Sequence, residues 1–474
     1  MFEIALAFQV IVWLAVLCLF LASGQATLFH PSTFYLVFHG LVFVLRTLMV
    51  YFYHFDAIWN YIGFQPSESD MIKTLGVTSV ALIAFVGTNV MAGRTNTLFP
   101  ATPAASFSPV QFKALAILTI LLFPWLILSI RASTSGEVTG ELTANGTLIM
   151  TNSTGYINDA QFMIAPLLTA WLLVTRCHRL NFVPIVLYVA YRTWCGWSRF
   201  TIISFLLAVV LVICWQYRKK WIPLSAIILG IPLLMLFNTL GHNRDYLQEI
   251  LKGEHASAME LDSGMSKLDK FKARADTQDF ANFDYLTFIV SLVPARTGTY
   301  TYGAQYLQLF TEPIPRILWK GKPAGAPVRT FNMNAYGNFT GLTFSLPGDG
   351  WSSGGWIGVV VTVSVVGMAL GIFHRWFWRH INNPMVALFY TSTTVMLMQW
   401  YRDGGISIAK FLLWNWLPLI LWIGMTWLLS GMPVPGNTMV LRTGERLRLV
   451  RPGRGQPVPG LPCAANQTGA TRSN

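Results

Sequence analysis

Charged residues are scarce in this sequence. Only 11% of the 474 residues are Asp, Glu, Lys or Arg, whereas soluble globular domains carry about 25%. Hydrophobic residues make up 54%, and they gather in runs of about 20, the length that crosses a bilayer as a helix. This composition excludes a soluble protein and indicates an all-α polytopic membrane protein.

Several chemical signatures are also missing. The five cysteines show no CxxC or Cys/His spacing, which argues against a zinc site and a disulfide framework. The sequence has no Gly-rich phosphate loop, no HExxH motif and no serine-hydrolase elbow. The acidic triplet Glu68-Ser69-Asp70 is only a weak indication of a metal site. We therefore expect neither a metal nor a cofactor.

The net charge of +13 raises the question of a nucleic-acid partner. Much of the excess lies in short loops and in the C-terminal tail, for example at Arg442, Arg446 and Arg448. Membrane proteins concentrate Lys and Arg in cytoplasmic segments of this kind. We interpret the charge as a determinant of topology and expect no nucleic-acid partner.

Apolar runs predict about eleven membrane spans, with about ten to twelve compatible with the sequence. Their ranges are 5–22, 33–53, 72–92, 112–130, 161–175, 181–194, 199–217, 221–240, 354–373, 384–400 and 407–430. The first span imitates a signal peptide, but Glu3 and the lack of a basic residue before it argue against cleavage. Basic and acidic loops alternate so that the N-terminus lies outside the cytoplasm and the C-terminus inside.

The spans divide the sequence into four regions. An N-terminal bundle of about eight spans (1–240) precedes a large polar loop outside the cytoplasm (241–352). A second bundle of about three spans (353–430) precedes a basic tail (431–474) whose composition is typical of disorder.

Two helices are expected inside the large loop. The apolar segment 283–294 is too short to cross a bilayer, so it either lies at the interface or re-enters the membrane, and Pro294 ends it. The aromatic-rich segment 299–312 is compatible with a second, amphipathic helix.

Arginine is the first candidate for a functional residue, since its planar fork binds phosphate through two parallel hydrogen bonds. Arg192 and Arg199 flank a tight connection on the face opposite the basic loops; anchoring at lipid phosphates is the alternative. Arg46 lies inside a span, where a charge is costly and either binds substrate or pairs with a buried polar group.

The large loop carries a second group of basic residues. They are Arg296, Arg316, Lys320, Lys322 and Arg329. Pro313 and Pro315 stiffen the chain around Arg316, which makes it the strongest candidate among them. Ordinary surface charge is the alternative interpretation.

Candidates for a general base lie near the ends of spans. His242 and Arg244 open the large loop, and histidine is a common general base. Asp349 lies in a glycine-lined turn just before a span, and Arg402 with Asp403 forms an acid–base pair in the last external loop. A solvated helix end is the alternative for His242.

Three ordered motifs resemble those of the Wzy-type O-antigen and exopolysaccharide repeat-unit polymerases. The first is Gly196-Trp197-Ser198-Arg199, similar to the family's Gly-Ser-Arg turn. The second is Tyr302-Gly303 followed by Ile314-Pro315-Arg316 and Trp319-Lys320-Gly321-Lys322-Pro323. The third is Pro347-Gly348-Asp349 followed by Gly354-Gly355 and a span, where Asp349 replaces the family's common Glu. Many spans and one large late periplasmic loop with short interfacial helices complete the resemblance.

The resemblance implies a glycosyltransferase of the bacterial inner membrane that joins undecaprenyl-diphosphate-linked oligosaccharide units at the periplasmic face. Arg199 and Arg316 would neutralise the leaving diphosphate without a metal, and Asp349 or His242 would take the acceptor proton. The set expected to contact the substrate is Arg46, Arg192, Arg199, Arg244, Arg296, Arg316, Lys322 and Arg402. Beyond lipids and lipid-linked glycans, the resemblance suggests a chain-length regulator and a flippase as partners.

Two other functions are compatible with the sequence. An O-antigen ligase would share the layout and the chemistry but use a lipid A core acceptor. A lipid-linked oligosaccharide flippase or another transporter would line a central cavity with charges, whereas the charges here crowd one outer face.

Overall fold

The computed structural model divides into two compact units, Met1–Asn437 and Thr438–Asn474. It describes residues 1–100, 106–134, 140–142, 148–150, 157, 159–194, 199–223, 272, 276–311, 314, 318–319, 327–338 and 343–430. All of these belong to the first unit and are helical except for loops and one antiparallel pair of short strands, β1 (Gly140–Leu142) and β2 (Leu148–Met150). The predicted tail, 431–474, lies outside the described residues.

Six helical stretches among the described residues are long and apolar enough to cross a membrane. They are α1 (Phe2–Ala22), the stretch Pro31–Tyr53, α5 (Glu68–Gly93), Pro109–Ala132 of α6 (Pro109–Thr134), α17 (Leu346–Arg379) and Phe411–Ser430 of α20 (Gly405–Ser430). The stretch Pro31–Tyr53 consists of α2 (Pro31–His39), a π-helical segment (Gly40–Leu45) and α3 (Arg46–Tyr53). These helices coincide with six of the predicted spans and are consistent with a helical membrane protein.

The remaining predicted spans are shorter or lie outside the described residues. The helices α8 (Ile164–Val174), α9 (Phe182–Trp194) and α10 (Arg199–Gln216) occupy three of them, and short 3-10 turns at Ala160–Met163 and Arg179–Asn181 precede α8 and α9. Of the predicted span 221–240, only residues 221–223 are described.

The predicted span 384–400 is not one continuous helix. Two helices, α18 (Pro384–Thr394) and α19 (Leu397–Asp403), occupy this region, with a break at Val395 and Met396. The hydroxyls of Thr391, Thr393 and Thr394 donate to carbonyls three or four residues earlier. Such bonds compete with the helical ladder and bend helices.

The region predicted as a large loop contains short helices. They are α14 (Asn282–Leu292), α15 (Ala304–Thr311), α16 (Pro327–Thr330) and 3-10 turns at Gln278–Phe280 and Met333–Ala335. Another short helix, α4 (Ala57–Ile62), lies in an earlier connection. Residues 282–290 are all buried, and α14 contacts α5 and α17. Helix α14 is therefore enclosed by other parts of the protein over residues 282–290.

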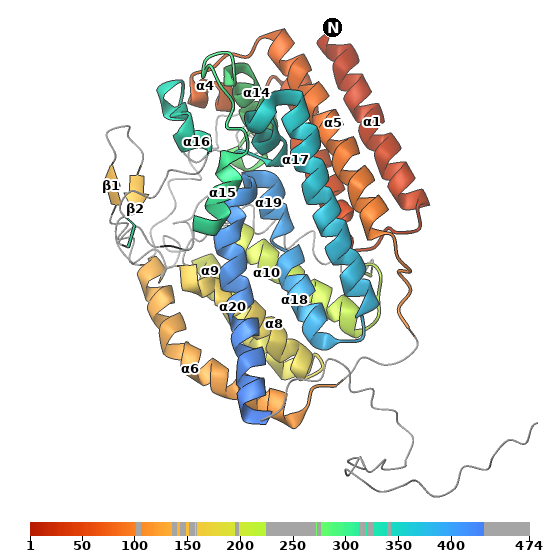
Figure 1. The fold of residues 1–474 in the computed structure, drawn as a ribbon, viewed down its shortest axis with the longest axis vertical. Coiled ribbons are helices and arrows are strands. Elements are labelled where there is room, and N and C mark those ends of the chain that lie inside the picture. Colours follow the sequence, from red (N-terminus) through yellow and green to blue (C-terminus); the bar gives the residue numbers. More distant parts are fainter. Residues whose placement is uncertain are drawn as a thin grey trace, which may run out of the picture. The chain divides into compact units, whose positions relative to one another are not determined.

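The helices α1, α5 and α17 run side by side, and α20 packs against α6 and α8 (Figure 1). The close contact of α5 with α17 depends on small residues. A Cβ added at Gly367 would lie 2.8 Å from the carbonyl oxygen of Phe85, and one at Gly371 would lie 2.8 Å from the backbone nitrogen of Gly93. Asn89 Nδ2 also donates to the carbonyl of Gly367 at 2.8 Å. Small residues of this kind let membrane helices approach closely and pack well.

We expect Gly371→Leu to destabilise the protein by about 1–3 kcal/mol, because the side chain would force α17 away from α5. The midpoint of thermal unfolding in detergent would measure the effect. Gly424→Leu on α20 is the matched control, since nothing lies within 4 Å of a Cβ at that position. Equal unfolding midpoints for the two variants would contradict the prediction.

Helix α17 is kinked at Gly354 and Gly355, whose backbone angles are not helical. Gly355 has φ +59°, and a Cβ there would lie 2.9 Å from the Tyr300 hydroxyl, so a side chain is excluded. The kink coincides with the predicted start of a span at residue 354. It separates the long apolar part of α17 from a short first segment that carries Asp349.

Candidate functional site

The described candidate site is centred on Asp349, in the first turn of α17. Ser345 caps this helix by accepting a hydrogen bond from the backbone N–H of Gly348. Asp349 is only 2% exposed, and its Oδ2 accepts a hydrogen bond of 2.6 Å from the backbone N–H of Gly405, the first residue of α20. The carboxylate therefore lies at the N-termini of two helices, where the helix dipoles favour negative charge.

The turn between α19 and α20 fits around this carboxylate. Gly404 has φ +84°, and a Cβ at this position would overlap the Asp349 carboxylate. Only glycine is compatible with this backbone angle and with the carboxylate so close. The carbonyl of Arg402 accepts hydrogen bonds from the backbone N–H of Ser345 and from Asn282 Nδ2, at 2.8 and 3.0 Å. These contacts join α14, α17 and α19 at one point and bring together the two separate sequence candidates, Asp349 and the segment 402–405.

Helix α15 forms another side of the site. Gln305 is 2% exposed, and its Nε2 donates to Ser353 Oγ at 2.6 Å and to the Asp349 carbonyl at 3.4 Å. The backbone N–H of Thr301 donates to the carbonyl of Ser352 at 2.8 Å, which fixes the start of α15 against α17. Sequence analysis missed Gln305. The only sequence signal for it is a polar residue among the aromatic residues of 299–312.

Burial shifts the pKa of two groups on the elements around Asp349. Burial raises the pKa of the Asp403 carboxyl to about 6, although the charge of Arg402, whose Nε lies 3.8 Å from Asp403 Oδ1, opposes the shift. Burial, and then the charge of Asp349, raise the pKa of the Tyr306 hydroxyl above its usual range. Carboxyl groups that titrate near the working pH are suited to acid–base catalysis.

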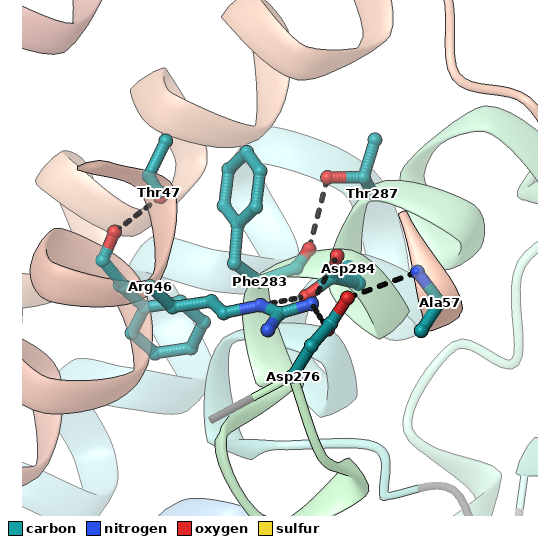
Figure 2. A network of polar contacts seen from close by, with 8 residues as sticks. Arg46, Thr47, Ala57, Asp276, Phe283, Asp284 and Thr287 are labelled. Atoms are coloured by element: carbon teal, nitrogen blue, oxygen red, sulfur yellow. Dashed lines mark hydrogen bonds and ion pairs between the residues drawn. The ribbon is translucent and has the colours of Figure 1, made fainter. Parts of the chain in front are cut away.

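A second buried polar cluster surrounds Arg46 (Figure 2). Arg46 Nε and Nη2 donate to the two carboxylate oxygens of Asp284 at 2.7 and 3.1 Å. Nη2 also lies 2.7 Å from Asp276 Oδ1, while Asp276 Oδ2 accepts from the backbone N–H of Ala57. Arg46 and Asp284 are 1% and 0% exposed. The guanidinium thus faces two carboxylates, which does not fit the prediction that Arg46 binds a diphosphate and favours the structural alternative.

Asp284 was not among the sequence candidates, although a signal for it exists. It stands between Phe283 and Tyr285 in an apolar segment. A charged residue in such surroundings needs a partner of opposite charge, because an unpaired buried charge is very costly. The sequence could not show that the partner is Arg46.

Two further candidate arginines lie on other elements. Arg192 on α9 is 2% exposed, and it donates to Gln161 Oε1 at 2.6 Å and to the Tyr188 hydroxyl at 3.1 Å. Arg296 is exposed in the loop after α14. Arg46 and Arg192 are thus both engaged by polar side chains of the protein itself.

Several sequence candidates cannot be placed. His242, Arg244, Arg316 and Lys322 lie outside the described residues, as does the side chain of Arg199. The acidic triplet lies at the N-terminus of α5, where both carboxylates have partners within the protein. Glu68 pairs with the N-terminal amine at 3.3 Å, and Asp70 bonds with Ser67, the N-cap of α5.

Comparison of the chain with protein-family models, with curated proteins and with solved structures finds no match. The fold and the site therefore define a class and not a family. The class is a helical membrane protein with a buried carboxylate where the N-termini of two helices meet.

Proposed function

We propose that this protein is a glycosyltransferase that polymerises undecaprenyl-diphosphate-linked oligosaccharide units at the periplasmic face of the bacterial inner membrane. The observation that carries the proposal is the hydrogen bond of 2.6 Å between Asp349 and Gly405, which holds a buried carboxylate in a fixed place. Asp349 belongs to the third motif that resembles the Wzy-type polymerases. The proposal includes about eleven spans and a periplasmic location for residues 241–352.

In the proposed reaction, a hydroxyl of the incoming unit attacks the anomeric carbon of the growing chain. The new glycosidic C–O bond forms as the C–O bond to the lipid diphosphate breaks, and the diphosphate leaves with the electron pair. Asp349 takes the proton of the attacking hydroxyl and later releases it to water. A positioned base of this kind contributes about 10²–10⁴-fold to the rate.

Basic residues would stabilise the negative charge on the departing diphosphate. Arg402 is a described cation that lies just before Gly404 and Gly405 in the sequence, and its side chain is 23% exposed. Arg199, Arg316 and Lys322 complete this part of the proposal on the strength of the motifs alone. Preorganised charges that meet developing charge are a large source of catalysis.

The test is a polymerisation assay with the purified protein in nanodiscs. Undecaprenyl-diphosphate-linked repeat units from the native host are added with a chelator and without nucleotide sugar, and the products are separated on a gel. We expect a ladder spaced by one repeat unit. Transfer only to a lipid A core acceptor would replace the proposal with a ligase, and translocation without transfer would replace it with a flippase.

A further inference from the structure

Three side chains converge on the space over Gly405. A Cβ placed on this residue would lie 3.4 Å from the Tyr306 ring, 3.5 Å from Trp400 Nε1 and 3.8 Å from Asp349 Oδ2. These are ordinary contact distances, so the position has room for about one methyl group. The absence of a side chain at residue 405 leaves this space to something else.

The orientation of the Gln305 amide is fixed by its neighbour Ser353. The hydroxyl of Ser353 donates to the carbonyl of Asp349 at 2.7 Å, so its oxygen can only accept from Gln305. The group within 2.6 Å of that oxygen must therefore be the amide nitrogen of Gln305. The Oε1 atom is left buried and has no hydrogen-bond partner among the described residues.

Trp400 carries a hydrogen-bond donor without a partner among the described residues. This donor is the buried indole Nε1–H. Buried polar atoms are nearly always hydrogen-bonded to protein, water or ligand. Gln305, which contacts the Asp349 carbonyl, thus has an unsatisfied acceptor, and Trp400, which lies next to Gly405, has an unsatisfied donor. The buried Tyr306 hydroxyl is a third polar atom without a hydrogen-bond partner among the described residues. These atoms together indicate a polar occupant.

The chemistry of these groups selects the occupant. A phosphate would be repelled by the Asp349 carboxylate, and a metal ion would meet the N–H groups of Trp400 and Gly405. A neutral hydroxyl fits all of them, because its oxygen accepts from an N–H while its hydrogen is donated to a carboxylate or amide oxygen.

We infer that the space over Gly405 binds one hydroxyl group of a neutral sugar, the acceptor in the proposed reaction. Trp400 Nε1–H donates to the attacking oxygen, which places its proton toward Asp349, and Gln305 Oε1 accepts from a neighbouring hydroxyl. This inference rests on the proposed function for the role of the sugar as acceptor. The binding itself can be tested without turnover.

The first experiment is saturation-transfer NMR with methyl glycosides of glucose, galactose and mannose, on protein in nanodiscs free of glycoside detergent. We expect at least one glycoside to bind the wild type. Gly405→Ala fills the space with a methyl group and should abolish binding. Trp400→Phe removes one donor and should weaken binding by about 3- to 10-fold, the effect of one lost hydrogen bond.

Matched controls exist for both substitutions. Gly424→Ala lies on the same helix, where a Cβ meets nothing within 4 Å. Trp416→Phe removes an indole N–H that donates to Thr393 Oγ1 at 2.9 Å. Both controls should bind the glycosides like the wild type.

The outcomes separate this inference from the proposed function. Failure of all glycosides to bind the wild type, or unchanged binding by Gly405→Ala and Trp400→Phe, would mean that only water occupies the space and would overturn the inference. Gly405-dependent binding without a polymer ladder would keep the sugar subsite and remove the polymerase. A ladder formed at the wild-type rate by Gly405→Ala would remove the acceptor role.

Discussion

Asp349→Asn is expected to lower the rate of polymer formation by about 10²–10⁴-fold, the usual contribution of a positioned general base. The amide has the shape of the carboxylate and keeps an oxygen to accept from the N–H of Gly405, so the junction of α17 and α20 should persist. The amide nitrogen cannot take a proton from the acceptor hydroxyl. The measurement is the initial rate of ladder formation in nanodiscs.

Asp56→Asn is the control for this prediction. Asp56 precedes α4 and is exposed, and its side chain makes no capping hydrogen bond. The control should polymerise at the wild-type rate. A variant with asparagine at 349 that unfolds at the wild-type temperature and still polymerises at the wild-type rate would remove Asp349 from the mechanism.

Arg46→Met is expected to destabilise the protein by about 3–5 kcal/mol, because two carboxylates would then face each other in a buried site without a cation. Thermal unfolding in detergent, followed by fluorescence, measures the loss. Arg94→Met is the control, since Arg94 is exposed.

A triple variant tests whether the two unpaired carboxylates cause the loss of stability. Changing Arg46→Met together with Asp276→Asn and Asp284→Leu removes all three charges, and replacing buried ion pairs by apolar groups is often neutral. We expect it to recover much of the lost stability. Equal unfolding temperatures for the wild type and Arg46→Met would show that the cluster contributes nothing measurable.

Hydropathy predicts those helices whose formation depends only on the residues of one sequence segment. The helices α1, α5 and α6 follow from their own apolar length, because a bilayer selects spans by length and polarity. The break between α18 and α19 depends instead on which hydroxyls bond back to the helix, and hydropathy does not report that. Apolar composition therefore predicted one span where the chain forms two helices.

In the candidate site, too, single residues could be found from the sequence, whereas contacts between distant segments could not. Asp349 stood out in the sequence as a carboxylate in a glycine-rich turn before a span. Its contact with Gly405 joins residues 56 positions apart and depends on the path of α18 and α19 between them. Gln305 and Trp400 became candidates only when their neighbours were known, since neither residue type is unusual at its position in the sequence.

The Arg46 cluster also bears on how the chain is made. Its cation and its Asp284 carboxylate are separated by 238 residues, so Arg46 is synthesised long before its partners. At roughly 5–20 residues per second, the interval is roughly 10–50 seconds. During that time the second span holds an unpaired arginine, which is costly to leave in lipid. The contact between Arg46 and Asp284 can therefore form only after residue 284 has left the ribosome.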